Sequence, residues 1–350
     1  SIRRQRQMCI RDSHGTGDVT LSNALGNSAP LTGLTISTDV LTAGALTLAN
    51  NSAVSITNSG SSSIGGVIAG SGVTLSKRGS GLLLLSGNNT YGGATTIAAG
   101  ILKLGHINAL GANGSSAATT VNLGATLDLN RLTVGETVIV DGGSVLNGVL
   151  SGPINLTANS TLEAGTGEEV IINGVISGDF GITLTGSGSF VLGGNNTYSG
   201  TTTISSGTLR ITHANALGSS AGSTTLANGA TLDLDSVAVV GENLTMNGGT
   251  LKDSTSSWGG NIVLTGSNNI DIATGHQLTI GGVISGDGTL TKISDGVLIL
   301  TNQNNSYTGM TTITAGKLAL TGSGSIATSA KLVANGTFDI SGTTSGASVK

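Results

Sequence analysis

The sequence predicts an all-β chain that folds as a β-solenoid, in which short strands stack coil upon coil. The composition is the first observation, with 58 Gly, 2 Pro, 9% charged and 2% aromatic residues in 350 positions. Short alternating runs such as Thr-Leu-Asp-Leu are the second, because they recur at roughly 6 to 9 residues between Gly, Asn or Ser. The third observation is internal repetition on a scale of about a hundred residues, which is typical of solenoid architectures.

The composition excludes several other classes of protein. Disorder is disfavoured because the net charge is only −4 and 37% of the residues are apolar. Frequent Gly, Ser, Thr and Asn disfavour helices, and Gly does not recur at every third position as collagen requires. The longest aliphatic run, residues 82–85, is far shorter than the roughly 20 apolar residues of a spanning helix. An outer-membrane barrel would need aromatic girdles, and the chain has only 3 Phe, 3 Tyr and 1 Trp.

Three related blocks begin at Gly66, Gly174 and Gly282, so that both intervals are 108 residues. Each block opens on Gly-Val-Ile, continues through an apolar strand, and reaches an Asn-Asn-Thr/Ser-Tyr turn followed by Thr-Thr-Ile. The nine turn positions that we single out are Asn88, Asn89, Tyr91, Asn195, Asn196, Tyr198, Asn304, Asn305 and Tyr307. Since coils of three short strands use about 20 to 25 residues, five coils per block would take about 21.6 residues each. Five whole coils would place the three Tyr side chains along one edge of the solenoid.

The first 14 residues do not match the rest of the chain. Arg3, Arg4, Arg6 and Arg11 lie there together with Cys9, the only cysteine. The abrupt change in composition predicts a non-native or disordered leader over residues 1–14, lying off the solenoid, in preference to a basic arm for nucleic acid. Residues 15–350 are then predicted to form one continuous β-helix with its three blocks.

The segments Gly-Val-Ile-Ser-Gly and Gly-Asn-Asn-Thr-Tyr-Ser-Gly-Thr-Thr-Thr-Ile resemble the autotransporter-associated β-strand repeat of type V secretion passengers, in three copies over about residues 64–340. This resemblance implies a right-handed parallel β-helix, exported through the outer membrane to the bacterial surface or the medium. It also implies an outer-membrane translocator barrel in the full-length chain. The repeat is specific for architecture and says little about activity.

Candidate catalytic and metal-binding residues are few. His106 and His213 occupy equivalent repeat positions, which favours a structural turn role, and His14 adjoins the leader. His276 with Asp271 could belong to a Ser-His-Asp site, but no nucleophile elbow accompanies them.

Acidic positions are equally sparse as candidate metal ligands. Asp128, Asp233 and Asp339 recur in Leu-Asp-Leu or Phe-Asp-Ile, which predicts outward strand positions in place of a calcium cage, and Glu168–Glu169 predict a solvated loop. We therefore expect no catalytic residues, metal or cofactor, and no nucleic-acid partner.

Two functions remain open from the sequence. The first is a secreted or surface-displayed passenger scaffold for adhesion, with a host-cell, matrix or glycan surface as partner, because a repetitive face gains avidity without a deep pocket. The alternative is a β-helical carbohydrate-active enzyme such as a polysaccharide lyase, which should gather Asp, Lys and Arg on one strand face.

Overall fold

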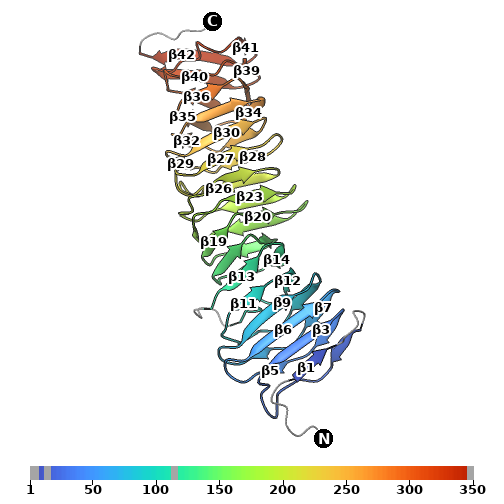
Figure 1. Ribbon diagram of the computed structural model, residues 1–350. Helices are drawn as coiled ribbons and strands as arrows, with labels where there is room; N and C mark the ends of the chain where they lie inside the picture. Colours follow the sequence, from blue (N-terminus) through green and yellow to red (C-terminus); the bar gives the residue numbers. More distant parts are fainter. Residues whose placement is uncertain (1–7, 12–16, 112–116, 345–350) are drawn as a thin grey trace. The chain divides into compact units, whose positions relative to one another are not determined.

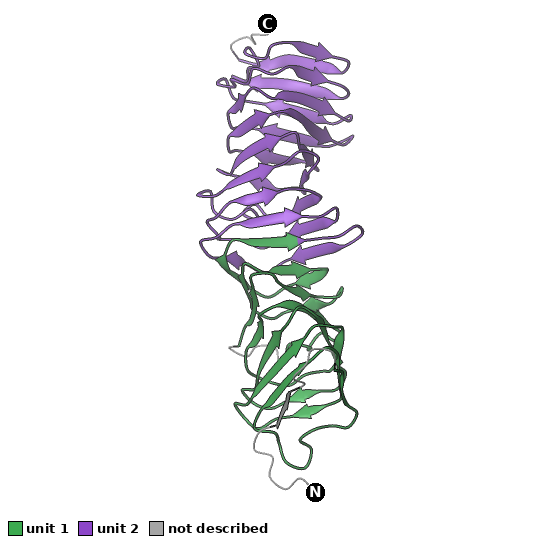
Figure 2. Cartoon of the chain, turned by 45° about the vertical axis from the view of Figure 1, so that its right-hand side comes forward, with its two compact units in different colours: residues 1–162 green, residues 163–350 purple. Residues whose placement is uncertain are grey.

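The chain folds into parallel β-solenoid structure, as the computed structural model shows for residues 8–11, 17–111 and 117–344 (Figure 1). These residues form strands and turns with no helix among them, so the predicted fold class is confirmed. Nothing in this part of the chain is a helix that could span a membrane. The chain divides into two compact units, residues 1–162 and 163–350, which are described separately (Figure 2).

The strands of the first unit form two long parallel series and two short parallel pairs. One long sheet contains, in order, β1 (Met8–Arg11), β3 (Leu34–Thr38), β6 (Ala53–Asn58), β9 (Thr74–Arg78), β11 (Thr95–Ile97), β13 (Thr119–Asn122), β16 (Val138–Asp141) and β19 (Ile154–Ala158). The other contains β2 (Val19–Leu21), β4 (Leu41–Ala43), β7 (Ser62–Ile64), β10 (Leu82–Leu85), β12 (Gly100–Leu104), β14 (Ala125–Asp128) and β17 (Ser144–Leu146). The short pairs are β5 (Leu46–Thr47) with β8 (Ile68–Ala69), and β15 (Thr133–Val134) with β18 (Gly148–Leu150).

The second unit has three parallel sheets, which we call the first, second and third sheets. The first sheet contains β21 (Glu169–Ile172), β24 (Ser189–Leu192), β26 (Thr208–Ile211), β28 (Thr231–Leu234), β31 (Thr250–Asp253), β34 (Ser267–Ile272), β37 (Thr289–Ile293), β39 (Thr311–Ile313) and β41 (Leu332–Ala334). The second contains β23 (Ile182–Thr185), β25 (Thr202–Ile204), β27 (Ser223–Leu226), β30 (Asn243–Asn247), β33 (Ile262–Thr265) and β36 (Ile284–Gly286). The third contains β29 (Ala238–Val239), β32 (Ser256–Trp258), β35 (Gln277–Ile280), β38 (Val297–Leu300), β40 (Lys317–Gly322) and β42 (Thr337–Thr343). The remaining strands are β20 (Ser160–Glu163) and β22 (Ile176–Ser177).

Alternating burial along each strand explains why these sequences form a solenoid. In the all-Leu strand β10, Leu83 and Leu85 are fully buried, whereas Leu82 and Leu84 are only half-buried. The two buried side chains lie in register with Leu102 and Leu104 of β12, on the next coil. Like residues therefore stack inside the solenoid, and each buried Leu contributes roughly 1.5 to 3 kcal/mol.

Part of the predicted leader is placed by the structure. The strand β1 pairs in parallel with β3, so residues 8–11 join a sheet where we expected them to lie off the solenoid. The other leader residues, 1–7 and 12–14, lie outside the described residues.

The 108-residue repeat does not span five coils. In the second unit, Tyr198 leads into β25 of the second sheet, whereas Tyr307 leads into β39 of the first sheet. Five coils beyond β25, the second sheet is continued by residues 303–307 themselves, since Ser306 N donates to the carbonyl oxygen of Ile284 in β36.

The strand count explains this shift. The fourteen strands β25 to β38, together with segments 213–218 and 303–307 in strand positions, make sixteen positions, one more than five coils of three. The five-coil count, and with it the expectation of one Tyr edge, is therefore wrong. Each repeat advances its motif by one face, because coils here average about 20 residues.

Candidate functional site

The second Asn of each Asn-Asn turn joins three successive coils. Asn89, Asn196 and Asn305 are nearly fully buried. Each side-chain oxygen accepts a hydrogen bond of 2.8 Å from the backbone N–H of the Ile in Gly-Val-Ile, one coil earlier: Ile68, Ile176 and Ile284. Each side-chain amide donates to a carbonyl one coil later: Ala109 at 2.6 Å, Ala216 at 2.6 Å and Ser325 at 3.0 Å. The spacing of the two repeat motifs is thus one coil, and the Asn side chain supplies backbone partners where no strand does.

The three Tyr side chains of the turns point into the interior. Tyr91, Tyr198 and Tyr307 are at most 1% exposed. Each hydroxyl is hydrogen-bonded to the Thr four residues later, at 2.7, 2.5 and 2.6 Å. Burial raises the pKa of all three phenols, that of Tyr307 to about 12. These residues hold the turn together and offer nothing to a ligand.

The first Asn of each turn lies at the surface. Asn88, Asn195 and Asn304 are exposed. In the first two copies its side-chain oxygen accepts from the next coil, Asn108 Nδ2 and Asn215 Nδ2, both at 2.8 Å. In the third copy the residue that corresponds to Asn215 is Gly324, which has no side-chain amide. There the backbone N–H of Asn304 donates to Asn302 Oδ1 at 2.9 Å. Two of the three repeats thus carry an exposed pair of stacked amides.

The three histidines that the structure describes lie in separate hydrogen-bonding environments. His106 Nδ1 and His213 Nδ1 accept from the backbone N–H two residues on, at 3.0 and 3.1 Å, which is the structural turn role that we predicted. His276 Nδ1 is 3.1 Å from Thr255 Oγ1, while Asp271 accepts from Ser294 Oγ at 2.6 Å. His14 lies outside the described residues.

The repeated acidic residues form ion pairs with basic residues on neighbouring coils. Asp128 is 3.1 Å from Lys103 and Asp339 is 3.2 Å from Lys317. Asp233 is the most buried of the three, lying 3.5 Å from Arg210 on one side and 3.3 Å from Lys252 on the other. The described residues contain no cluster of three or more His, Cys, Asp or Glu that could hold a metal ion.

The adjacent acids Glu168 and Glu169 bond to their own surroundings. Glu168 Oε2 accepts from Gly165 N at 2.8 Å, and Glu169 Oε1 accepts from Ser189 Oγ at 3.4 Å. Both contacts belong to a turn and its neighbouring coil.

Two lysines are buried as hydrogen-bond donors to backbone carbonyls. Lys77 and Lys292 are 0% exposed. Lys77 Nζ donates to the carbonyls of Arg78, Gly79 and Ala99 at 2.8, 2.8 and 3.1 Å. Burial lowers the pKa of Lys77 to about 8. Sequence analysis missed this role, because a Lys between polar neighbours gives no local sign that carbonyls of two coils surround it.

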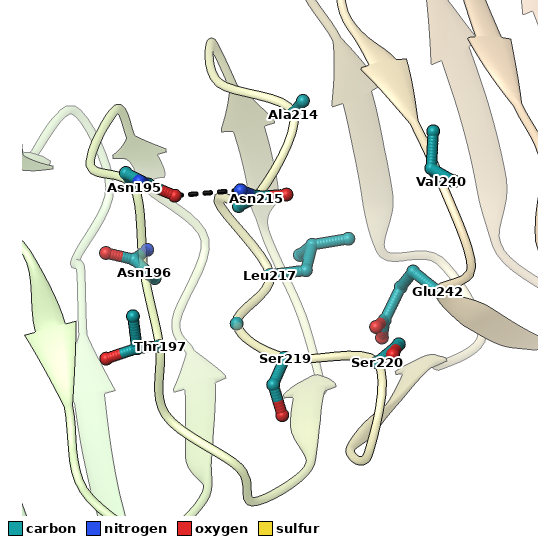
Figure 3. Close-up of a pocket in the computed structure, with 11 residues that line it drawn as sticks. Asn195, Asn196, Thr197, Ala214, Asn215, Leu217, Ser219, Ser220, Val240 and Glu242 are labelled. Carbon is teal, nitrogen blue, oxygen red and sulfur yellow. Dashed lines mark hydrogen bonds between the residues drawn. The ribbon is translucent and has the colours of Figure 1, made fainter.

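A pocket of about 350 Å³ lies on the second unit beside the stacked amides (Figure 3). Three successive coils line it with amide, hydroxyl and small apolar groups: Asn195, Asn196, Thr197, Ala214, Asn215, Leu217, Gly218, Ser219, Ser220, Val240 and Glu242. Glu242 is only 4% exposed, and its Oε1 accepts from Thr224 Oγ1 at 2.8 Å. Burial raises the pKa of this carboxyl to about 7, although the Thr224 bond acts in the opposite direction.

The same Thr–Glu pair recurs in the first unit. Glu136 Oε1 accepts from Thr119 Oγ1 at 2.6 Å, and burial raises the pKa of Glu136 to about 7 as well. Both Glu residues end a Val-Gly-Glu triplet, at residues 134–136 and 240–242. This recurrence is a sequence signal that could have revealed the buried carboxyls.

Comparisons with known proteins agree with this architecture. Residues 75–104, 182–211 and 285–320 match the passenger-associated-transport-repeat family. The adhesin BmaC autotransporter of Brucella suis biovar 1 (strain 1330) is 32% identical over 257 residues, covering 70% of this chain. The chain spans 7% of the length of that relative. No solved structure matches the chain.

Proposed function

Because the chain belongs to the autotransporter passenger-repeat family, we propose that it is an adhesive scaffold. The family's passengers are exposed at the cell surface or secreted through the outer membrane, and this localisation holds for the chain. In this proposal the scaffold binds a host-cell, matrix or glycan surface. The full-length protein would also contain an outer-membrane translocator barrel. Residues 15–350 would supply the scaffold in three repeats, and no catalytic role is assigned.

One observation supports this proposal above the others. The repeat directs its specific hydrogen bonds inward, through Asn89, Asn196 and Asn305, which we call the Asn staples, and through the Tyr–Thr pairs. Exposed amides and hydroxyls occupy the outside. A surface of small polar groups repeated along a rigid core suits many weak contacts that act together. The ion pairs of Asp128, Asp233 and Asp339 are separate pairs between coils and give the lyase alternative no shared site.

The test is binding of the whole chain to immobilised cells and matrix. Deleting residues 175–282, one repeat, should weaken binding of the multivalent chain gradually, because fewer contacts remain. If the unchanged chain cleaves polysaccharides and one point substitution abolishes this turnover, the scaffold proposal is contradicted and the enzyme is favoured.

A further inference from the structure

The pocket of the second unit holds a carboxylate without a cationic partner. Glu242 is the only acidic or basic residue among those that line it. Among the described residues, no ion pair involves Glu242. Burial raises the pKa of the Tyr198 phenol, and the charge of Glu242 raises it further. A negative charge held this close to the interior is costly unless a positive group pairs with it.

The neighbouring groups favour a compact cation with several donors. Thr224 already occupies Oε1 of Glu242, so the fork of an Arg, which needs two carboxylate oxygens, matches the site poorly. An ammonium group has three donors, and Ser220, which lies beside the Glu242 carboxylate, Ser219 and Asn215 line the same pocket with oxygen acceptors (Figure 3). Val240 is 82% exposed at the rim, where it can cover the aliphatic stem of a lysine.

We propose that this pocket binds a lysine side chain of a protein partner, with its ammonium on Glu242 and its methylene stem against Val240. This inference rests on the adhesive function proposed above and names the chemical target of one site. A single such contact is weak, which fits a scaffold that acts through many contacts.

The other repeats share parts of this arrangement. The first repeat has the same Thr–Glu pair at Glu136 and the same stacked amides at Asn88 and Asn108. The carbonyls of Ala216 and Ser325 accept equivalent bonds in the second and third repeats, so the residues before them, Asn215 and Gly324, are equivalent. Gly324 has no side chain, so the third repeat lacks the exposed amide. The third repeat therefore lacks one of the groups that line the proposed lysine site.

The experiment titrates the full 350-residue chain with Nα-acetyl-lysine amide, followed by NMR. We expect binding that is at least ~10-fold weaker for Nε-acetylated lysine, since acetylation removes the charge, and for Glu242→Gln. Glu169→Gln, at an exposed position outside this pocket, should bind as the unchanged protein does. Affinity should rise between pH 6 and pH 8 as Glu242 ionises, and Glu242→Gln should lose this rise.

A second variant keeps the test independent of changes at the buried position. Val240→Lys, at an exposed site, should fold normally and place its own ammonium in the pocket, lowering probe affinity by at least ~10-fold. Equal lysine binding by the unchanged chain and both pocket variants would overturn the proposal, and so would preferred binding of glucosamine. Because these probes are small molecules in solution, their failure leaves cell adhesion as a separate result.

Discussion

Glu242 should make the protein less stable as the pH rises from 5 to 8. Its pKa lies near 7 in the folded chain, against an ordinary value of 4.5, because burial disfavours the charged form. The folded state therefore binds the proton more tightly than the unfolded state does. Stability from this group is fully present below pH 4.5 and is lost as the pH rises through 7. At about 1.4 kcal/mol per pH unit the shift corresponds to about 3 kcal/mol, and residual solvent contact reduces this to about 2 kcal/mol.

Glu242→Gln isolates this effect, because a Gln oxygen can still accept from Thr224. We expect the variant to match the unchanged protein in urea unfolding at pH 5 and to exceed its stability by about 2 kcal/mol at pH 8. Glu136→Gln should behave likewise in the first unit, where burial raises the pKa of Glu136 to about 7. Glu169→Gln, at an exposed position, controls for the loss of one negative charge. The reasoning is refuted if Glu242→Gln leaves the difference between pH 5 and pH 8 unchanged.

Three further changes test the interior of the solenoid. Asn196→Ala should lower the free energy of unfolding in urea by about 2 to 4 kcal/mol, because Ile176 N and Ala216 O lose their partner. Asn195→Ala at the surface should lower it by less than about 1 kcal/mol. Equal losses would contradict the role of the Asn staple. Lys292→Met should lower stability by about 1 to 3 kcal/mol by removing its bonds of 2.7 Å to the carbonyls of Ile293 and Ser294, and an unchanged melting temperature would show that these bonds contribute nothing. Gly282→Ala would place a Cβ 1.8 Å from the carbonyl oxygen of Gly260, so circular dichroism should report a lower melting temperature. A Cβ at Gly275 meets no atom within 4 Å, so Gly275→Ala measures only the strain of a side chain at the positive φ of Gly275. A smaller loss for Gly282→Ala than for Gly275→Ala would refute the close approach.

The sequence predicts the strands well and the interior polar groups poorly. Alternation in a strand such as β10 is local, so it identifies which Leu side chains face inward. The structural role of His106 and His213 is predicted from their equivalent repeat positions, and the hydrogen bond of each ring to the backbone two residues on agrees with it. Burial of Lys77 depends instead on the carbonyl of Ala99, 22 residues away on another coil. Burial of Glu242 likewise depends on stacking that no short window contains.

The coil count failed for a related reason. A coil takes 16 residues between Val138 and Ile154 but 24 between Thr95 and Thr119. With such variation, 108 residues fit five coils or five and one third equally well, and only the stacking in the sheets decides between them.

The extra strand position changes what deletion of residues 175–282 should do. Within the second unit, Gly174 precedes β22 and Gly282 precedes β36, so joining residue 174 to residue 283 keeps the Gly-Val-Ile motif intact. The strand that follows must take the place of β22, one face away from its own, and every later strand moves by one face with it. The new chain can still fold, because all three sheets of this unit bury alternate apolar residues and the Asn staple travels with its repeat. In the deletion variant, cysteines that replace Ile284 and Asn305 should still lie on adjacent coils and form a crosslink. Loss of that 284–305 crosslink, or global unfolding seen by circular dichroism, would show that faces are not interchangeable and that each repeat is fixed to its own sheet.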